Sequence, residues 1–299
     1  MLRWGAGSEP VVSDNSERAT IEYRPRPEDP IGVMDSGVGG LSVLRHLRQL
    51  LPSESTLYFA DQHHIPYGPR PPEQVRDFTA VITHFLLRHK AKLIVVACNT
   101  ATAAALDYLR QTFPAVPFVG MEPAVKPAAL TTRSGKVGVL ATPSTLNSNR
   151  YAALMARFAA GIEVHEDPCV GLVQLIEAGA LDTLETRDLL RRVIDPMLAA
   201  GVDTLVLGCT HYPFVSPLLQ ELAGEQVTII DPAPAVARQT RYVLQQRGLS
   251  APEHSRDTLR CFTSGDARQF DDLAQLLTGY TGNSETARWR GGELVVPSE

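Results

Sequence analysis

Short apolar segments alternate with longer segments of helical periodicity along most of this chain. Short apolar runs of this kind are typical of strands buried within a parallel sheet. In the segment 72–89, Val75, Ile82 and Phe85 fall on one helical face behind Pro71-Pro72, which predicts a helix. Strict alternation of strands and helices predicts an α/β fold with a largely parallel sheet. The strands are expected at 31–34, 56–60, 93–97, 116–120, 136–141, 203–207, 227–230 and 259–263.

The chain also repeats itself weakly at an offset of more than a hundred residues. Ile31-Gly-Val-Met-Asp35 resembles Val137-Gly-Val-Leu-Ala141, and the apolar run ending at Cys98 resembles the one ending at Cys209. A repeat of this length indicates two related α/β halves rather than a solenoid of short units.

Two proline sites at strand ends, Gly120-Met-Glu-Pro123 and Ile230-Asp-Pro232, are candidates for the crossings between the halves. The first lobe is then discontinuous and the second is inserted into it. The polar, aperiodic ends are expected to be a flexible extension and a flexible tail. The expected parts are the extension at 1–30, one lobe at 31–121 plus 233–277, a second lobe at 122–232, and the tail at 278–299.

Composition narrows the class of protein. A formal net charge of −5 argues against a nucleic-acid binder, which normally carries a basic excess. No apolar run approaches the roughly 18 residues that cross a bilayer, and the first residues lack the apolar core of a signal peptide. Four cysteines in 299 residues, none in a CxxC pair, do not make a disulfide framework. We therefore expect a cytoplasmic protein without a membrane or nucleic-acid partner.

The ends of the expected strands carry the residues of chemical interest, because ligands of open α/β sheets bind beyond the carboxyl ends of the strands. Hydroxyl groups, an amide and helix-start N–H groups gather there and suit a small carboxylate. Ordinary helix capping would explain any one of them alone. The strand-end segments are Asp35-Ser36-Gly37, Asp61 with Ile65-Pro-Tyr-Gly68, Cys98-Asn99-Thr100, Thr142-Pro-Ser-Thr145 and Cys209-Thr210-His211.

The cysteines at two of these strand ends are the strongest functional signal. Cys98 and Cys209 each end an apolar strand before a residue that can cap a helix, where unpaired N–H groups favour a thiolate. Either one alone is more simply a small core residue, but two at matched positions favour function. His211 is interpreted as an acid–base group or a support for the thiol rather than a histidine bonded only to backbone. Cys169 and Cys261 are interpreted as structural.

Two other patterns have weaker functional interpretations. Gly37-x-Gly39 nearly matches a dinucleotide-binding turn, with Ser42 in place of the third glycine and Asp61 near the position of a ribose-binding acid. A tight turn explains the glycines equally well. His63-His64 could indicate a metal, but solvation in a loop is the simpler interpretation, so no metal is expected.

Six segments of the chain resemble those of a known family, the glutamate racemases, which racemise an amino acid without a cofactor. The similar segments follow one another in family order over most of 31–247. They are Ile31-Gly-Val-Met-Asp-Ser-Gly-Val-Gly-Gly-Leu-Ser42, Pro66-Tyr-Gly-Pro69, Val96-Ala-Cys-Asn-Thr-Ala101, Glu122-Pro-Ala-Val-Lys-Pro127, Ala141-Thr-Pro-Ser-Thr145 and Leu207-Gly-Cys-Thr-His-Tyr-Pro213.

The resemblance implies roles. The site is expected between two pseudo-symmetric lobes, with Cys98 deprotonating D-glutamate and Cys209 deprotonating L-glutamate. Asp35 is expected to assist Cys98, and His211 to assist Cys209. Glu177 is the candidate for the family's further glutamate, in a segment that departs from the commoner proline-rich pattern. Substrate binding is expected from Asp35, Ser36, Pro66, Tyr67, Gly68, Asn99, Thr100, Thr142, Thr145 and Thr210.

The same resemblance implies no cofactor, glutamate as the substrate, and D-glutamate supply for bacterial peptidoglycan and cell shape. A related racemase for aspartate or another acidic amino acid remains an alternative. A binding protein that kept the fold is another, because some relatives bind and inhibit DNA gyrase. Some members of this family carry an N-terminal extension and respond to a peptidoglycan precursor, UDP-N-acetylmuramoyl-alanine. The extension at 1–30 therefore suggests that precursor as an activator, and a simple tail is the alternative interpretation. A monomer or a homodimer is expected.

Overall fold

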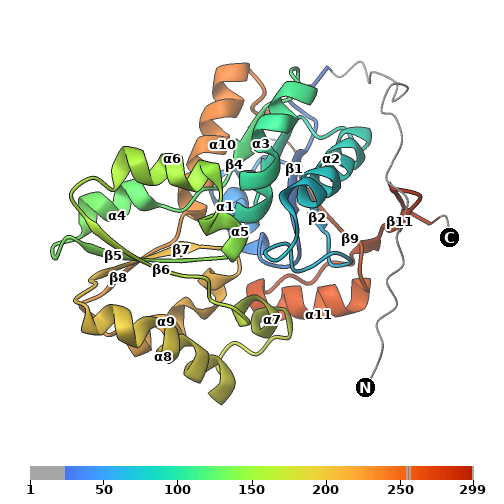
Figure 1. The fold of residues 1–299 in the computed structure, drawn as a ribbon. Helices are drawn as coiled ribbons and strands as arrows, with labels where there is room; N and C mark the ends of the chain where they lie inside the picture. The colour runs from blue at the N-terminus through green and yellow to red at the C-terminus, as the bar shows by residue number, and fades with distance from the viewer. Residues whose placement is uncertain (1–23, 254, 256, 298–299) are drawn as a thin grey trace.

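Two parallel sheets organise the computed structural model, which describes residues 24–253, 255 and 257–297 (Figure 1). The first sheet has the order β10-β9-β2-β1-β3-β4 and the second β6-β5-β7-β8. The first comprises β1 (Ile31–Asp35), β2 (Thr56–Ala60), β3 (Leu93–Val96), β4 (Phe118–Gly120), β9 (Leu259–Thr263) and β10 (Glu285–Thr286). The second comprises β5 (Lys136–Ala141), β6 (Glu163–Asp167), β7 (Thr204–Gly208) and β8 (Thr228–Ile230). The predicted α/β fold with two lobes is confirmed.

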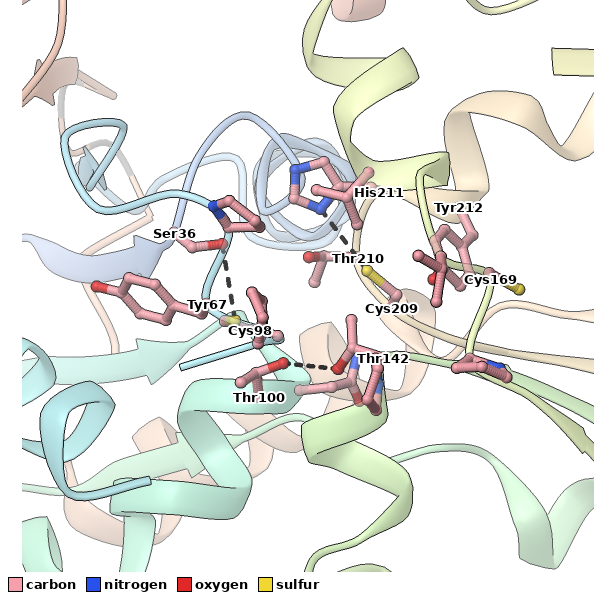
Figure 2. Close-up of a pocket in the computed structure, with 18 of the residues that line it drawn as sticks. Ser36, Tyr67, Cys98, Thr100, Thr142, Cys169, Cys209, Thr210, His211 and Tyr212 are labelled. Atoms are coloured by element: carbon pink, nitrogen blue, oxygen red, sulfur yellow. Dashed lines mark hydrogen bonds between the residues drawn. The ribbon is translucent and has the colours of Figure 1, made fainter. Parts of the chain in front are cut away.

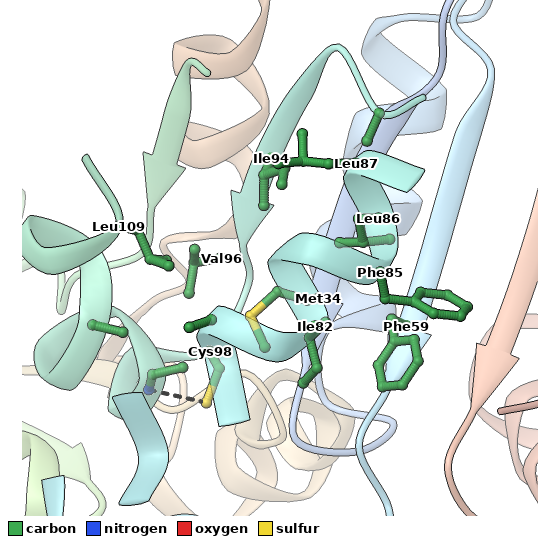
Figure 3. Packing of buried hydrophobic residues seen from close by; sticks show 14 of the residues in the cluster. Met34, Phe59, Ile82, Phe85, Leu86, Leu87, Ile94, Val96, Cys98 and Leu109 are labelled. Atoms are coloured by element: carbon green, nitrogen blue, oxygen red, sulfur yellow. Dashed lines mark hydrogen bonds between the residues drawn. The ribbon is translucent and has the colours of Figure 1, made fainter. Parts of the chain in front are cut away.

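Helices cover both faces of the first sheet. α2 (Pro72–Arg88) and α3 (Asn99–Thr112) lie on one face, and α1 (Leu41–Leu50), α10 (Ala233–Arg247) and α11 (Ala267–Thr278) on the other. Figure 3 shows Ile82 and Phe85 of α2 packed near Met34 of β1 in the first of these layers. Each such fully buried side chain contributes about 2 kcal/mol. The predicted helix at 72–89 is confirmed to within one residue, and its expected apolar face is the face that packs.

The second sheet is covered in the same way. α4 (Val125–Thr131) and α6 (Asn149–Phe158) pack on the face of Val137 and Val139. The opposite face, with Leu140, Leu205 and Leu207, holds α7 (Leu172–Glu177), α8 (Leu184–Ala199) and α9 (Ser216–Ala223). Two short elements complete this lobe, α5 (Pro143–Leu146) and the 3₁₀ helix η1 (Tyr212–Val215). None of the helices in the described part of the chain is both long and apolar enough to span a bilayer.

The pairing register places the carboxyl ends of neighbouring strands level with one another. Met34 of β1 pairs with Phe59 of β2 and with Val96 of β3, so these three strands end together. In the second sheet, Ala141 of β5 pairs with Gly208 of β7. Because the strands are parallel, their carboxyl ends share one edge in each sheet. The chain passes from the first sheet to the second after Gly120 and returns after Ile230.

The predicted flexible tail at 278–299 is wrong for the residues described. β10 adds a parallel strand to the first sheet, and β11 (Arg288–Arg290) pairs with β12 (Glu293–Val295) in a hairpin. Ala287 and Leu294 are buried against the first lobe. These strands have only two or three residues each, which is too short to give a periodic signal. Residues 298–299 lie outside the described residues.

The N-terminal extension is partly corrected as well. The predicted flexible residues 1–23 lie outside the described residues, but 24–30 runs against the first lobe. Lys92 is fully buried, and its Nζ donates a hydrogen bond to the Pro27 carbonyl. The backbone N–H of Lys92 donates to the Pro30 carbonyl at 2.8 Å. Its ammonium also pairs with buried Glu54. Residues 27–30 are therefore attached to the lobe and are not a free tail.

Candidate active site

A pocket lies at the carboxyl ends of the strands, with walls from both lobes (Figure 2). Its volume of about 140 Å³ corresponds to about five waters, which suits a small ligand. The lining residues are Ser36, Pro66, Tyr67, Gly68, Pro69, Cys98, Asn99, Thr100, Thr142, Pro143, Pro168, Cys169, Val170, Gly171, Val173, Gln174, Cys209, Thr210, His211 and Tyr212.

Cys98 lies on the wall contributed by the first lobe. It follows β3 and caps α3, where its sulfur accepts a 3.5 Å hydrogen bond from the Ala101 N–H. The thiol faces the Ser36 hydroxyl at 4.0 Å. Burial raises the pKa of Cys98 well above its ordinary value, and the nearby Asp35 charge adds to this effect. The resting Cys98 is therefore a neutral thiol that can donate a proton.

Cys209 lies on the opposite wall, at the end of β7 in the second lobe. Figure 2 shows the two sulfurs facing the space between them. Cys209 Sγ lies 3.7 Å from His211 Nδ1, and His211 Nε2 lies 2.7 Å from Glu177 Oε1. Burial would lower the pKa of His211, but its hydrogen bonds to Cys209 and Glu177 outweigh this and raise it well above 6.5. A protonated His211 can donate a hydrogen bond to the Cys209 sulfur.

Glu177 and Asp35 stand behind the pocket walls and do not line the cavity. Besides His211, the Oε1 atom of Glu177 accepts the Val38 N–H of the first lobe at 2.8 Å. Asp35 is fully buried, accepting the Gly37 N–H at 2.8 Å and the Thr210 hydroxyl at 3.0 Å. Burial raises the pKa of Asp35 to about 6, although the charge on His211 opposes the rise. Its carboxyl can thus exchange a proton near neutral pH.

A row of threonine hydroxyls joins the two lobes along one side of the pocket. Thr100 Oγ1 lies 2.9 Å from Thr142 Oγ1, which lies 3.0 Å from Thr145 Oγ1. Thr145 is buried behind the other two and does not line the cavity. The Asn99 side chain is also buried, and neither its amide nor its carbonyl has a hydrogen-bond partner within the described chain. The row and the free amide offer donors to a polar ligand.

Two hydrogen bonds hold the Cys209–His211 turn to the first lobe. Thr210 donates to Asp35, and buried Ser42 donates to the Thr210 carbonyl at 2.9 Å. The Ser42 hydroxyl also lies 2.8 Å from the Gly39 carbonyl. Ser42 therefore links the glycine turn of one lobe to the thiol-bearing turn of the other.

The glycine turn approaches the other lobe too closely to hold a pyrophosphate. A Cβ at Gly37 would lie 2.1 Å from Glu177 Oε1, and one at Gly39 would lie 2.4 Å from His211 Nδ1. Asp61, the residue considered for a ribose, is fully buried and accepts from Tyr67, Ser264 and Trp289. These contacts argue against the dinucleotide alternative and explain the glycines by close packing.

Of the two histidines, His63 is exposed as expected, but His64 differs from the expectation. His64 is not a solvated loop residue: it stacks on Phe78 with 3.7 Å between ring centroids, and its Nδ1 lies 2.9 Å from Asp61. Among the described residues, no group of three or more His, Cys, Asp or Glu side chains could hold a metal ion. Burial by residues distant in sequence was invisible in the local pattern.

Sequence reasoning missed one wall of the pocket, the segment 168–174 together with Tyr212. This segment follows β6, a polar edge strand paired only with β5, which was not predicted because it lacks an apolar run. Cys169 was interpreted as structural; it is buried in the second lobe's core but also lines the pocket, with a positive φ of 45°. Cys261 is buried in the first lobe's core, as expected. Gly171, with φ of 96°, was the available local signal of a tight turn.

The arrangement can move protons on two faces of one small molecule. One sulfur is a neutral thiol, the other lies beside a protonated imidazole, and hydroxyl and amide donors between them can bind carboxylates. All the residues predicted to bind substrate line the pocket, except Asp35 and Thr145.

Comparisons with known proteins agree on one family. The family model described as Asp/Glu/Hydantoin racemase matches residues 31–240. A glutamate racemase of Ectopseudomonas mendocina is 54% identical over 250 residues, covering 84% of this chain and 95% of that protein. The crystal structure of a glutamate racemase isoform of Bacillus anthracis has a TM-score of 0.80 at 34% identity, covering 90% and 100% of the two chains. An Escherichia coli glutamate racemase in complex with L-glutamate and the activator UDP-MurNAc-Ala has a TM-score of 0.76 at 33% identity, covering 92% and 100%.

Proposed function

This chain belongs to the Asp/Glu/hydantoin racemase family, and from that membership we infer that it interconverts L-glutamate and D-glutamate. The relatives that are about half identical over most of the chain carry the name of that activity. The two parallel-sheet lobes and the pocket between them supply what such a reaction requires.

The observation that carries the mechanism is the placement of Cys98 and Cys209 on opposite walls of one pocket. Racemisation removes the proton on Cα from one face and returns a proton to the other. A thiolate on one side and a thiol on the other perform both steps, and their roles exchange in the reverse direction. We assign Cys209 as the base for L-glutamate and Cys98 as the base for D-glutamate.

For L-glutamate, the Cys209 thiolate takes the Cα proton and the C–H electron pair stays on Cα. The resulting carbanion takes a proton from the Cys98 thiol, which becomes the thiolate. His211 stabilises the Cys209 thiolate, and Glu177 holds the imidazole in place. Asp35, with a pKa of about 6, assists the Cys98 side by accepting or returning a proton near neutral pH.

Charge develops on the substrate during the reaction and needs stabilisation. The pocket offers the Ser36, Thr100, Thr142 and Thr210 hydroxyls and the unpartnered Asn99 amide. Tyr67 lies on the same side of the pocket as Cys98 (Figure 2), and its neighbours Pro66 and Gly68 also line the cavity. We propose that these donors bind the substrate carboxylates and that Thr145 orients Thr142 from behind.

The test of this function is a racemisation assay on the purified chain. After dialysis against a chelator, we expect L- and D-glutamate to interconvert without added metal or pyridoxal phosphate. Activity that appears only when either is restored would overturn the mechanism. A specificity constant for aspartate equal to or above that for glutamate would favour the alternative substrate instead.

The wider role follows from the product. We propose that D-glutamate from this enzyme supplies bacterial peptidoglycan and that the enzyme acts in the cytoplasm. The Escherichia coli structure with UDP-MurNAc-Ala supports a peptidoglycan-precursor activator as a further proposal. Racemisation rates measured with and without that nucleotide test it, and sedimentation of the purified chain separates a monomer from a homodimer.

A further inference from the structure

We propose that Trp289, in the C-terminal hairpin, is a positioning residue that fixes the substrate-contacting segment Pro66-Tyr67-Gly68 through the carboxylate of Asp61. The proposal rests on the proposed function, because that segment is one wall of the pocket. It concerns a part of the chain that lies outside the catalytic motifs and is 228 residues from Asp61.

Asp61 is the centre of the arrangement. It follows directly after β2 and is fully buried, and its Oδ1 atom accepts the Trp289 Nε1–H and the Ser264 hydroxyl, both at 2.8 Å. Its Oδ2 atom accepts the Tyr67 hydroxyl at 2.7 Å and lies 2.9 Å from His64 Nδ1. A buried carboxylate needs all of these partners, because each unpaired lone pair is costly without water.

Tyr67 transmits the position of Asp61 to the pocket. Its ring is only 2% exposed and lines the cavity, while its hydroxyl points away to Asp61. Its neighbours Pro66 and Gly68 line the same wall. A shift of the carboxylate therefore moves the whole wall, and displacements of this kind cost binding or rate at a distance.

Trp289 also belongs to the ring cluster beneath this wall. Its ring lies 4.8 Å from His64 and 5.7 Å from Phe78, measured between centroids. Phe78 in turn lies 6.0 Å from Tyr67. Trp289→Phe separates the hydrogen bond to Asp61 from the ring contacts, because it keeps much of the ring surface and removes the N–H donor.

The hairpin has other attachments that keep it folded without this hydrogen bond. Ala287 donates its N–H to the Thr263 carbonyl, Leu294 is buried, and Arg88 donates to the Leu294 carbonyl at 3.0 Å. Trp289→Phe is therefore expected to leave the hairpin in place. The variant isolates the effect of one donor on Asp61.

The experiment compares Trp289→Phe with Arg290→Ala, an exposed neighbour on the same strand. For Trp289→Phe we expect KM for glutamate to rise about three- to tenfold while kcat changes less than twofold. For Arg290→Ala neither constant should change. Equal effects in the two variants, or a loss of kcat without a change in KM, would overturn the proposal.

A second variant separates positioning from general destabilisation. Tyr67→Phe breaks the same path at its other end, so the KM effect of Trp289→Phe should be largely absent in a Tyr67→Phe background. Fully additive effects would contradict a path through Asp61. Chemical denaturation of each variant checks that the KM change is not caused by unfolding.

These measurements also distinguish this proposal from the proposed function. Racemisation by the unaltered chain is the test of function, and it comes first. If that activity is present and Trp289→Phe behaves as Arg290→Ala does, only the positioning role fails.

Discussion

His211 Nε2 lies 2.7 Å from Glu177 Oε1, in a contact that joins the thiol-bearing turn after β7 to the end of α7. The same carboxylate oxygen accepts the Val38 N–H from the other lobe. Glu177 therefore holds the imidazole behind Cys209 and fastens the two lobes together at that point. We propose that Glu177 is a positioning residue that acts through His211.

Replacing Glu177 tests this role through the pH profile. Burial opposes protonation of His211, and the hydrogen bonds to Cys209 and Glu177 keep the pKa of His211 high. Glu177→Gln removes the negative charge, so the pKa of His211 should fall and the alkaline limb of the kcat profile for L-glutamate should move to lower pH. Glu185→Gln, an exposed acid on α8, is the matched control and should leave the profile unchanged. An unmoved alkaline limb in Glu177→Gln would contradict the role.

The two-base assignment is tested by serine variants. Cys98→Ser and Cys209→Ser should each lose most racemisation, because a hydroxyl is a far weaker acid than a thiol. The overall equilibrium constant of a racemase is one, which forces kcat/KM to be equal in the two directions, so the asymmetry must be sought in a half-reaction. Elimination of chloride from β-chloroalanine needs only the first deprotonation. Cys98→Ser should keep elimination from the L-enantiomer, and Cys209→Ser should keep it from the D-enantiomer.

Two outcomes would reject that assignment. Equal loss of elimination from both enantiomers in both variants would mean that the thiols do not serve separate faces. Full racemisation in either variant would mean that the replaced cysteine is only a buried core residue. His211→Asn should follow Cys209→Ser, with a smaller loss on the scale of roughly 10²–10⁴-fold.

Ser42 gives a prediction on the coupling between the lobes. Its hydroxyl donates to the Thr210 carbonyl, next to Cys209, and does not touch the pocket. In Ser42→Ala we expect elimination from β-chloro-L-alanine to fall about tenfold and elimination from the D-enantiomer to change little. Ser42→Thr keeps the hydroxyl and should restore most of the loss. A variant in which both enantiomers are affected equally would indicate a general packing defect instead.

Asp35 gives a prediction on stability. Its folded pKa of about 6 lies above the ordinary value of 3.8 for an aspartate, so protonation stabilises the folded state. That contribution is fully present below pH 3.8 and is lost as the pH rises through about 6, a change of about 3 kcal/mol. Asn at this position can accept from the Gly37 N–H and donate to the Thr210 hydroxyl.

Asp35→Asn should therefore be inactive or nearly so, yet gain stability relative to the unaltered chain as the pH rises from about 4 to 7. Urea unfolding across this range measures the difference in free energy. A difference that stays constant or shrinks with rising pH would show that the buried carboxyl is not the source. The pH dependence is the informative quantity, because substitution at a buried site also changes packing.

Local pattern predicted much of the fold because its strands carry continuous apolar runs. All eight expected strands correspond to strands of the two sheets, and the helix behind Pro71-Pro72 begins at Pro72. The strand β6 was not predicted from the sequence, because an edge strand with one neighbour needs no apolar run. The short strands of the C-terminal segment were not predicted either, because they bury only single residues such as Leu294.

The sequence by itself determined where the reactive groups lie along the chain. Cys98 and Cys209 follow apolar strands, and His211 lies two residues from Cys209, so covalent connection alone places them at strand ends beside helix starts. Such neighbours are fixed by a few backbone dihedrals and leave a readable motif.

Only the tertiary structure decided which distant groups complete the site. It places Glu177 on His211, Ser42 on the Thr210 carbonyl and Trp289 on Asp61, across separations of 34, 168 and 228 residues. The physical reason is that a single hydrogen bond between distant segments has no period and no required spacing in sequence. Its geometry exists only once the packing of both lobes has brought the two segments together.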